Sequence, residues 1–355
     1  MPDATWVIAE AEREEILEPA LPIVDPHHHL WDSQVEVGDL RPPRHPFGYA
    51  VRVTPRYLID ELLADVTAGH NVRATVFMQC GAMYRAAGPE HLRVVGETEF
   101  VNGIAAMSAS GRYGESRLCA AIVGTADLRQ GAAVGEVLEA QRVAGGGRFR
   151  GIRQGGSWNA DPDVLGRRGP AAEGLYRRPE FREGFARLAQ FGFSFDSWML
   201  EPQLQDLIDL AKAFPQTPVI LNHIGTPLGI ASYAGKRPER FTIWRSKIET
   251  LASLPNTYVK LGGLGMPHPG FDSFMATPPA SSAQLAAEWG PYILACIEAF
   301  GVERCMFESN FPVDRCSGSY VTLWNAFKRI VAGASADEKM ALFSGTATKV
   351  YRPVL

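Results

Sequence analysis

Short apolar runs alternate with amphipathic stretches along nearly the whole chain. In the amphipathic stretches apolar residues recur at helical spacing, as Ile59, Leu62, Leu63 and Val66 do. The apolar runs have the length of buried strands, and they are 21–25, 72–80, 118–124, 149–153, 192–198, 217–223, 256–261 and 304–308. Strands that alternate with helices form parallel sheets, and eight such units close into a barrel. The pattern therefore predicts an α/β protein with a (β/α)8 TIM-barrel fold; an open doubly wound sheet is the alternative.

The same pattern predicts how the chain is divided. Residues 1–20 precede the first strand and are predicted to form an N-terminal arm, and residues 21–355 are predicted to form one barrel domain. The longest loops, such as 33–53, follow strands, as expected when βα loops build a site. Helices after the eighth strand form a C-terminal extension, and the last begins at a capping box from Ser335 to Glu338.

Composition excludes several classes of function. The 355 residues carry 35 Lys and Arg against 39 Asp and Glu, a net charge of −4, without the basic stripe of a nucleic-acid surface. No apolar run approaches the ~20 residues of a membrane span, and the acidic N-terminus lacks the features of a signal peptide. Five cysteines without a Cys-x-x-Cys motif fit a reducing compartment. We expect a cytoplasmic protein with a small-molecule substrate and neither nucleic acid nor membrane as partner; a homo-oligomer is an open alternative.

Polar residues gather where the predicted strands end, which is where TIM barrels place their active sites. Alternation along the first strand puts Asp25, His27 and His29 on one face and His28 on the other. The later strands end in further polar or aromatic residues, namely Arg153, Asp196, Trp198, His223, Lys260, Glu308 and Asn310, and Tyr84 follows the second strand. The remaining histidines, His45, His70, His91 and His268, fall in predicted loops or helices and are expected to be solvated.

Four segments resemble the amidohydrolase superfamily. They are Asp-Pro-His-His-His-Leu-Trp-Asp at 25–32, Leu-Asn-His-Ile-Gly at 221–225, Tyr-Val-Lys-Leu-Gly-Gly-Leu at 258–264 and Phe-Glu-Ser-Asn-Phe-Pro-Val at 307–313. The resemblance covers residues 21–353 and is narrowest to the amidohydrolase 2 branch of TIM-barrel hydrolases. That branch includes lactonases for sugar lactones and for intermediates of aromatic degradation, so the resemblance implies a hydrolase.

The resemblance also implies roles for particular residues. The family's His-x-His pair matches His27 and His29, and its strand-six histidine matches His223. The family's last strand ends in Gly-Ser-Asp-Trp-Pro, whose Asp binds metal or activates water, and here Asn310 stands in its place. An amide cannot accept a proton at neutral pH, so Asn310 is left to hydrogen-bond a substrate or orient a water.

Another carboxylate must then activate the water. Glu308 lies two residues before Asn310 and on the same predicted face, so it is the first candidate. A structural glutamate paired with Lys260 or Arg153 is the alternative interpretation of Glu308. Asp25 and Asp196 are the other candidate bases.

Two cofactor states are compatible with the histidines. His27, His29 and His223 can hold one divalent metal, for which Zn²⁺ is the first choice, or can polarise a carbonyl without metal, as the lactonase branch does. The strand-five histidine of many relatives is absent, because the segment reads Phe195-Asp196-Ser197-Trp198. A binuclear metal site is therefore not expected.

These observations predict a hydrolase that opens a lactone of a carboxylated small molecule. Arg153 is expected to anchor the substrate carboxylate, because its planar fork suits that group, and Lys260 is expected to stabilise the oxyanion. Tyr84, Asp196, Trp198 and Asn310 complete the predicted substrate contacts. The alternatives are a metal-dependent decarboxylase of an aromatic acid, an amide or imide hydrolase, and a degenerate binding protein without catalysis.

Overall fold

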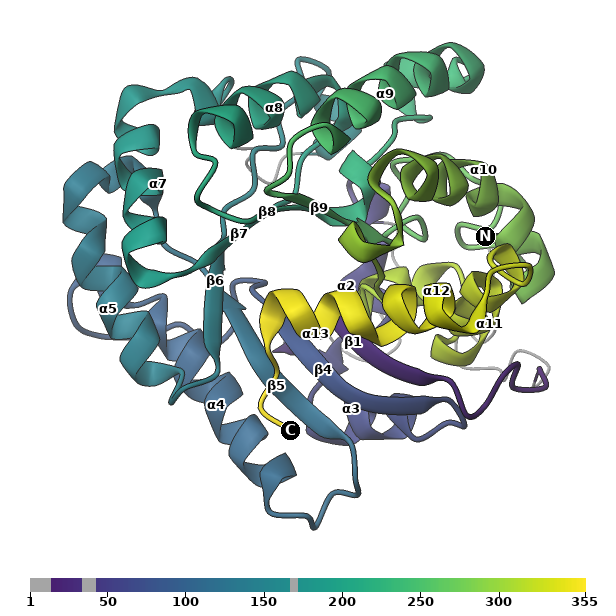
Figure 1. The fold of residues 1–355 in the computed structure, drawn as a ribbon, viewed down its shortest axis with the longest axis horizontal. Coiled ribbons are helices and arrows are strands. Elements are labelled where there is room, and N and C mark those ends of the chain that lie inside the picture. The colour runs from purple at the N-terminus through teal and green to yellow at the C-terminus, as the bar shows by residue number, and fades with distance from the viewer. Residues whose placement is uncertain (1–13, 34–42, 167–171) are drawn as a thin grey trace.

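Eight parallel strands form one nearly closed barrel with helices between them (Figure 1). The structure is a computed structural model that describes residues 14–33, 43–166 and 172–355. In order around the sheet the strands are β1 (Pro22–His28), β4 (Asn71–Met78), β5 (Arg117–Gly124), β6 (Phe149–Arg153), β7 (Ser194–Ser197), β8 (Val219–Leu221), β9 (Thr257–Leu261) and β10 (Cys305–Phe307). All eight predicted strands are present, and the predicted TIM-barrel fold is confirmed.

The barrel closes where the chain just after β10 meets the end of β1. The backbone N–H of His29 donates to the carbonyl of Phe311 at 2.7 Å, and that of Asn310 donates to the carbonyl of His27 at 2.9 Å. These bonds connect the histidine run to the last strand's loop. The first and last predicted site segments therefore meet at one edge of the barrel mouth.

Most of the helices surround the barrel (Figure 1). The helices of the chain are α2 (Tyr49–Val53), α3 (Ile59–Val66), α4 (Val95–Ala109), α5 (Gly135–Ala144), α6 (Pro162–Leu165), α7 (Pro179–Phe191), α8 (Leu204–Ala213), α9 (Arg237–Ala252), α10 (Ser282–Phe300), α11 (Tyr320–Ile330), α12 (Ala336–Met340) and α13 (Thr346–Tyr351). Serine side chains cap three of the later helices, and the predicted capping box at Ser335 and Glu338 is present at the start of α12.

Two apolar clusters hold the barrel together. The larger one lies between the strands and the helix layer, and the smaller one fills the barrel interior with residues such as Val24, Val76 and Met306. The predicted C-terminal extension reaches this interior, because Ala347 and Tyr351 of α13 pack among the strand residues. The backbone N–H of Val354 donates to the carbonyl of Ala120 and fixes the chain end against β5.

Two short strands, β2 (Trp31–Asp32) and β3 (Arg56–Tyr57), pair with each other outside the eight-stranded sheet. Two local predictions were wrong. The sixth strand ends at Leu221 because Asn222–Gly225 forms the short helical turn η6. His70 is buried, because its ring lies between Nζ of Lys328 and the carbonyl of Val321.

The predicted N-terminal arm, residues 1–20, falls partly outside the described residues. Its described end contacts α11, where the side chain of Asn325 bonds to Glu14, Glu15 and Leu17. Within the described ranges no helix combines the length and apolar character needed to cross a bilayer.

Candidate active site

A bulge in β1 decides which of its side chains enter the barrel mouth. The pairing of β1 with β4 slips between Asp25 and His28, around Pro26, as is common where proline interrupts a strand. His27 and His29 consequently point into the mouth together, with their Nε2 atoms 3.3 Å apart. His28 faces the other way, where Nε2 lies 2.9 Å from the hydroxyl of Thr75. The prediction for these three histidines agrees with the structure.

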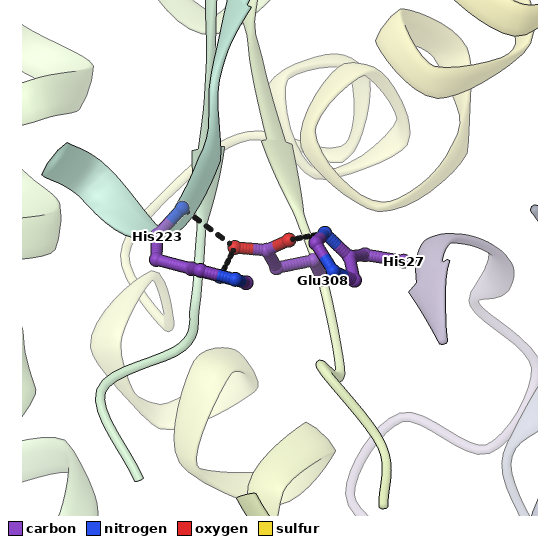
Figure 2. Close-up of side chains that lie close together, drawn as sticks. All are labelled: His27, His223 and Glu308. Carbon is purple, nitrogen blue, oxygen red and sulfur yellow. Dashed lines mark hydrogen bonds and ion pairs between the residues drawn. The ribbon is translucent and has the colours of Figure 1, made fainter. Parts of the chain in front are cut away.

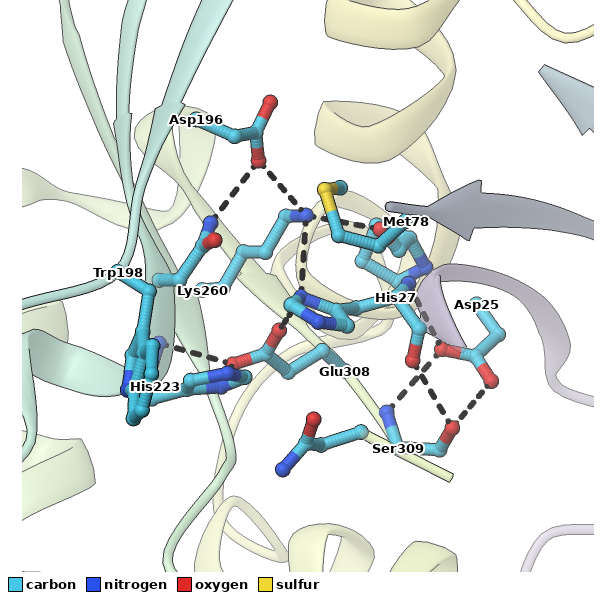
Figure 3. Close-up of polar contacts among 12 residues, drawn as sticks. Asp25, His27, Met78, Asp196, Trp198, His223, Lys260, Glu308 and Ser309 are labelled. Carbon is cyan, nitrogen blue, oxygen red and sulfur yellow. Dashed lines mark hydrogen bonds and ion pairs between the residues drawn. The ribbon is translucent and has the colours of Figure 1, made fainter. Parts of the chain in front are cut away.

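The same bulge removes Asp25 from that face, which corrects the prediction that Asp25 shares it. The carboxylate of Asp25 accepts bonds from the hydroxyl of Ser309 at 2.6 Å and from the backbone N–H groups of His27 and Ser309 (Figure 3). It also accepts a bond from the hydroxyl of Tyr320 at 3.0 Å. Tyr320 belongs to α11 in the outer layer. Burial raises the pKa of Asp25 to about 6 against these bonds. Asp25 therefore links β1, the last loop and α11 and does not meet a substrate.

Glu308 joins two of the three predicted histidines. Its Oε1 lies 2.7 Å from Nδ1 of His223, and its Oε2 lies 2.7 Å from Nδ1 of His27 (Figure 2). Oε1 also accepts the backbone N–H of His223 at 3.0 Å, so Oε1 is an acceptor and Nδ1 of His223 carries the hydrogen. Burial raises the pKa of Glu308 to about 8, and the charge of Lys260 opposes that shift. The partners of Glu308 are thus the imidazoles of His27 and His223. The alternative interpretation had paired Glu308, as a structural residue, with Lys260 or Arg153.

Each of the three imidazoles presents an unprotonated Nε2 atom to the mouth of the barrel. Nδ1 of His29 lies 2.8 Å from the carbonyl of Met78, which only accepts, so His29 carries its hydrogen on Nδ1. Nη1 of Arg153, which can only donate, lies 3.2 Å from Nε2 of His27, so Nε2 is the acceptor and His27 also carries its hydrogen on Nδ1. Burial lowers the pKa values of His27, His29 and His223 well below their usual range, so the rings are neutral. Each ring then offers an Nε2 lone pair, which can bind a cation or accept a proton.

The position of His223 depends on a strained turn and a close glycine. His223 has φ of 55° and lies in the left-handed region, and Ile224 follows it there with φ of 48°. Non-glycine residues rarely adopt this conformation, and it concentrates at functional sites. Gly263, after β9, allows the ring to approach, because a Cβ added at Gly263 would lie 2.2 Å from Nδ1 of His223.

Two cations flank His27. Nη1 of Arg153 lies 3.2 Å from Nε2 of His27, and Nε of Arg153 donates to Oε1 of Gln79 at 3.4 Å. Arg153 ends β6 and is partly exposed, so of these two cations it is the one that a ligand can meet. Lys260 lies deeper and is fully buried, with Nζ 3.4 Å from Nδ1 of His27.

Lys260 is committed to the protein, which corrects the prediction that it stabilises an oxyanion. Its Nζ donates to Asp196 and to the carbonyl of Pro26, each at 2.9 Å, and lies over the ring of Tyr351 (Figure 3). Oδ1 of Asp196 also accepts from the amide of Asn222 and the hydroxyl of Tyr351, so Asp196 is an internal counter-ion of Lys260. Lys260 acts on the site through the positive charge that it places beside His27.

The remaining predicted residues lie around this centre at different depths. Asn310 is buried with φ of 52°, and its amide donates to Asp314 at 2.7 Å, so its Oδ1 is the atom left to face a ligand. Trp198 is partly exposed, and its indole N–H donates to the hydroxyl of Thr226. Tyr84 is 40% exposed, on the loop after β4.

Two functional candidates were missed by sequence reasoning. Asp314 is buried one helical turn after Asn310, and its carboxylate also accepts the backbone N–H of Gly265 at 3.1 Å. Its spacing of four from Asn310 was the available signal. His268 was predicted to be solvated, but it is 1% exposed and packs near Trp198. The prolines on both sides of His268 were the signal for a rigid loop.

The chemistry of these donors fits one divalent metal ion. Within the described part of the chain, one group of potential ligands lies within 4.8 Å of one another, and it consists of His27, His223 and Glu308. His29 is not in this group, although its Nε2 lies 3.3 Å from Nε2 of His27. Buried imidazoles with anchored Nδ1 atoms are typical metal ligands, whereas the guanidinium of Arg153 beside His27 opposes a second positive charge.

Known proteins resemble this chain over almost its full length. The chain is 34% identical to the protein y4mH of Sinorhizobium fredii over 93% of this chain and 98% of that protein. It is 25% identical to L-fucono-1,5-lactonase of Burkholderia multivorans over 92% of this chain and 95% of the lactonase. The fold matches a crystal structure of a Burkholderia multivorans amidohydrolase with bound zinc, with a TM-score of 0.68, 26% identity and coverage of 93% and 99%.

The family comparison covers the barrel and the chain segments at its mouth. The sequence profile of the Amidohydrolase family matches residues 24–352. This range begins within β1, includes the other seven barrel strands and ends just after α13. The match includes the His-x-His segment of β1, the histidine after β8 and the carboxylate after β10. The chain therefore belongs to the amidohydrolase family.

Proposed function

We propose that this hydrolase opens the ester ring of a lactone of a carboxylated small molecule. The observation that carries the proposal is the placement of His27 between Arg153 and Glu308, with Glu308 also holding His223. The site thus combines a cationic donor for a carbonyl oxygen with a proton acceptor fixed by a carboxylate. The likeness to L-fucono-1,5-lactonase supports a cyclic ester as substrate.

In this proposal the proton of the attacking water goes to Nε2 of His223. Nε2 is the unprotonated atom of this ring, because Nδ1 donates to Glu308. Glu308 stabilises the imidazolium that forms, as a carboxylate behind a catalytic histidine does. Both of its oxygens already contact imidazole nitrogens, so Glu308 acts through His223 and not directly on the water. This assignment refines the prediction that Glu308 is itself the base.

Arg153 is the partner proposed for the oxygen that becomes negative. The water oxygen bonds to the carbonyl carbon, and the guanidinium donates to the resulting oxyanion. When the ester bond breaks, the ring oxygen takes the proton from His223 and leaves as a hydroxyl group, while the carbonyl carbon becomes that of a carboxylic acid. Loss of the acid's proton to solvent gives the carboxylate that Arg153 can hold. A further carboxylate on the substrate fits the same positive field of Arg153 and Lys260.

A metal ion can assist the same residues. His27, His223 and Glu308 would hold a single ion, of which Zn²⁺ is the usual choice for imidazole and carboxylate ligands, and it would polarise the carbonyl and acidify water. Arg153 and Lys260 lie within 3.4 Å of His27, so their charges weaken the binding of any such ion.

A panel of lactones assayed with wild type and Glu308→Gln tests the proposal. Each carboxylate oxygen of Glu308 now faces Nδ1 of one imidazole, whereas the side chain of glutamine offers one acceptor oxygen and one donor N–H group. One imidazole must therefore change tautomer in the variant. We expect kcat to fall about 100-fold or more. The control is Glu201→Gln, because Glu201 is also buried but pairs with Arg240 outside the site.

Three outcomes would contradict the proposal. Full kcat in Glu308→Gln at neutral pH would remove Glu308 from the mechanism. Turnover that survives His223→Ala would remove the proposed proton acceptor. Release of CO₂ from aromatic acids, with no lactone opened, would instead identify a decarboxylase.

A further inference from the structure

His268 is a buried polar residue whose ring has no polar partner in residues 14–33, 43–166 and 172–355. It lies in the loop between β9 and α10 and is 1% exposed. Neither Nδ1 nor Nε2 makes a hydrogen bond to any described residue. Buried polar groups are normally satisfied, so two unpaired nitrogens on one ring require an explanation.

The surroundings of His268 place it over the barrel mouth. Its ring centroid lies 6.2 Å from that of Trp198, which follows β7, and 5.4 Å from that of Phe47 in the short helix η1 (Pro46–Gly48). A positive charge on His223, the proposed proton acceptor, would lower the pKa of His268, so the two rings lie near one another. The ring of His268 therefore lies beside Trp198 and near the histidines of the site.

Packing does not account for a histidine at this position. The backbone already fixes the loop, since the N–H of Gly229 donates to the carbonyl of His268 at 2.8 Å and that of Gly270 donates to the carbonyl of Pro267 at 2.9 Å. Gly229 is so close that an added Cβ would lie 2.1 Å from the carbonyl oxygen of Pro269. A phenylalanine ring would fill the same aromatic surroundings without leaving two polar atoms unpaired.

The neighbouring residue His45 has hydrogen-bond partners for both of its ring nitrogens. Nδ1 of His45 accepts the backbone N–H of Phe47 at 3.2 Å, and Nε2 of His45 lies 3.1 Å from the carbonyl of Asp163. His45 thus uses both nitrogens within the protein. His268, 5.9 Å away between ring centroids, uses neither.

We propose that His268 is a specificity-determining residue that hydrogen-bonds a hydroxyl group of the substrate lactone. A neutral imidazole offers one donor and one acceptor, which a hydroxyl group can satisfy together. Burial, with smaller contributions from His45 and His223, lowers the pKa of His268 to about 3, so its ring brings no charge for a carboxylate. Trp198 and Phe47 supply apolar faces for the carbon side of a hydroxylated ring. The inference rests on the proposed function, because it names part of that function's substrate.

The test compares two lactones in wild type, His268→Phe and His268→Gln. D-glucono-1,5-lactone and other hydroxylated 1,5-lactones represent the proposed substrates, and δ-valerolactone has the same ring without hydroxyl groups. We expect His268→Phe to lower kcat/KM for the best hydroxylated lactone roughly 10- to 100-fold, mainly through KM, with less than a threefold effect on δ-valerolactone. His268→Gln, which keeps a donor and an acceptor, should recover part of the loss. His91→Phe, a surface change, is the control and should alter neither substrate.

The outcomes separate this inference from the proposed function. Equal losses on both lactones in His268→Phe, or no loss on either, would overturn the role of His268 while leaving the lactonase proposal intact. If wild type opens no lactone, the proposed function fails, and calorimetric titration of the same hydroxylated lactones then decides. Absence of binding by wild type, or an unchanged Kd in His268→Phe, overturns the inference; a Kd weakened at least tenfold in His268→Phe supports it.

Discussion

The distance between Gly263 and His223 leads to the sharpest prediction. Gly263→Ala adds one methyl group, whose carbon would lie 2.2 Å from Nδ1, 2.3 Å from Cγ and 2.5 Å from Cβ of His223. Ordinary contact begins at 3.4 Å, so the imidazole must retreat by about 1.2 Å or the loop must move by the same amount. Such a shift separates Nδ1 from Glu308, because their contact is only 2.7 Å.

The expected effect on activity follows from that displacement. A misplacement of about 1 Å in a reacting group lowers rates by about 100-fold, so we expect kcat/KM for lactone opening to fall by at least that factor. The backbone adds a separate effect, because Gly263 has φ of 67° and alanine in that region is less stable by about 1–2 kcal/mol.

A matched glycine separates the two effects. Gly192 ends α7 with φ of 65°, and nothing lies within 4 Å of a Cβ added there. Gly192→Ala should therefore lose about 1–2 kcal/mol of unfolding free energy and keep full activity. Both variants are measured by urea unfolding and by titration of the acid released from the lactone. Gly263→Ala with kcat/KM within threefold of Gly192→Ala would refute the claim that the position of His223 limits the reaction.

Three further predictions concern charge. Lys260→Met removes the ion-pair partner of the buried Asp196 and should lower the unfolding free energy by about 3–5 kcal/mol in urea. Adding Asp196→Asn should recover part of the loss, and an unchanged midpoint would contradict the ion pair. Burial, with the charge of Lys328, lowers the pKa of His70 to about 4. The unfolded chain therefore binds a proton at His70 more readily than the folded chain does. The stability that is present above pH 6.5 is lost as the pH falls towards 4. His70→Leu should flatten this loss by up to roughly 3 kcal/mol between those pH values, and parallel curves would argue against it. Arg153→Gln removes a cation beside His27 and should raise zinc affinity about tenfold in chelator titrations, whereas equal affinity would show that Arg153 does not oppose the metal.

The barrel and the residues at its mouth follow from local properties of the sequence. Apolar periods of two and 3.6 residues distinguish strands from helices, and their alternation leaves few topologies other than a parallel barrel. The carboxyl ends of parallel strands meet at one face, so His27, His223 and Glu308 were predicted to converge without any knowledge of distances. Their convergence required only the strand periodicity and the order of the elements.

Which atom each residue presents was decided by tertiary contacts. Pro26 could have warned of a bulge, but the turn of Asp25 towards Ser309 and Tyr320 depends on the last loop and α11, almost 300 residues away in sequence. Lys260 looked like an oxyanion donor until Asp196 and the carbonyl of Pro26 were found to occupy it. A strand pattern gives the face of a side chain, whereas hydrogen-bond partners come from elements packed later.

The histidines show most clearly which properties follow from the sequence and which depend on tertiary contacts. From the sequence alone, His268 was one more loop histidine and His223 one more strand end. The positive φ of His223, its fit against Gly263 and the unpaired ring of His268 exist only once distant loops close over the mouth. The sequence by itself determined which residue types reach the mouth, because periodicity is local. Only the tertiary structure decided their tautomers, partners and burial, because those depend on atoms that the chain brings together from far apart.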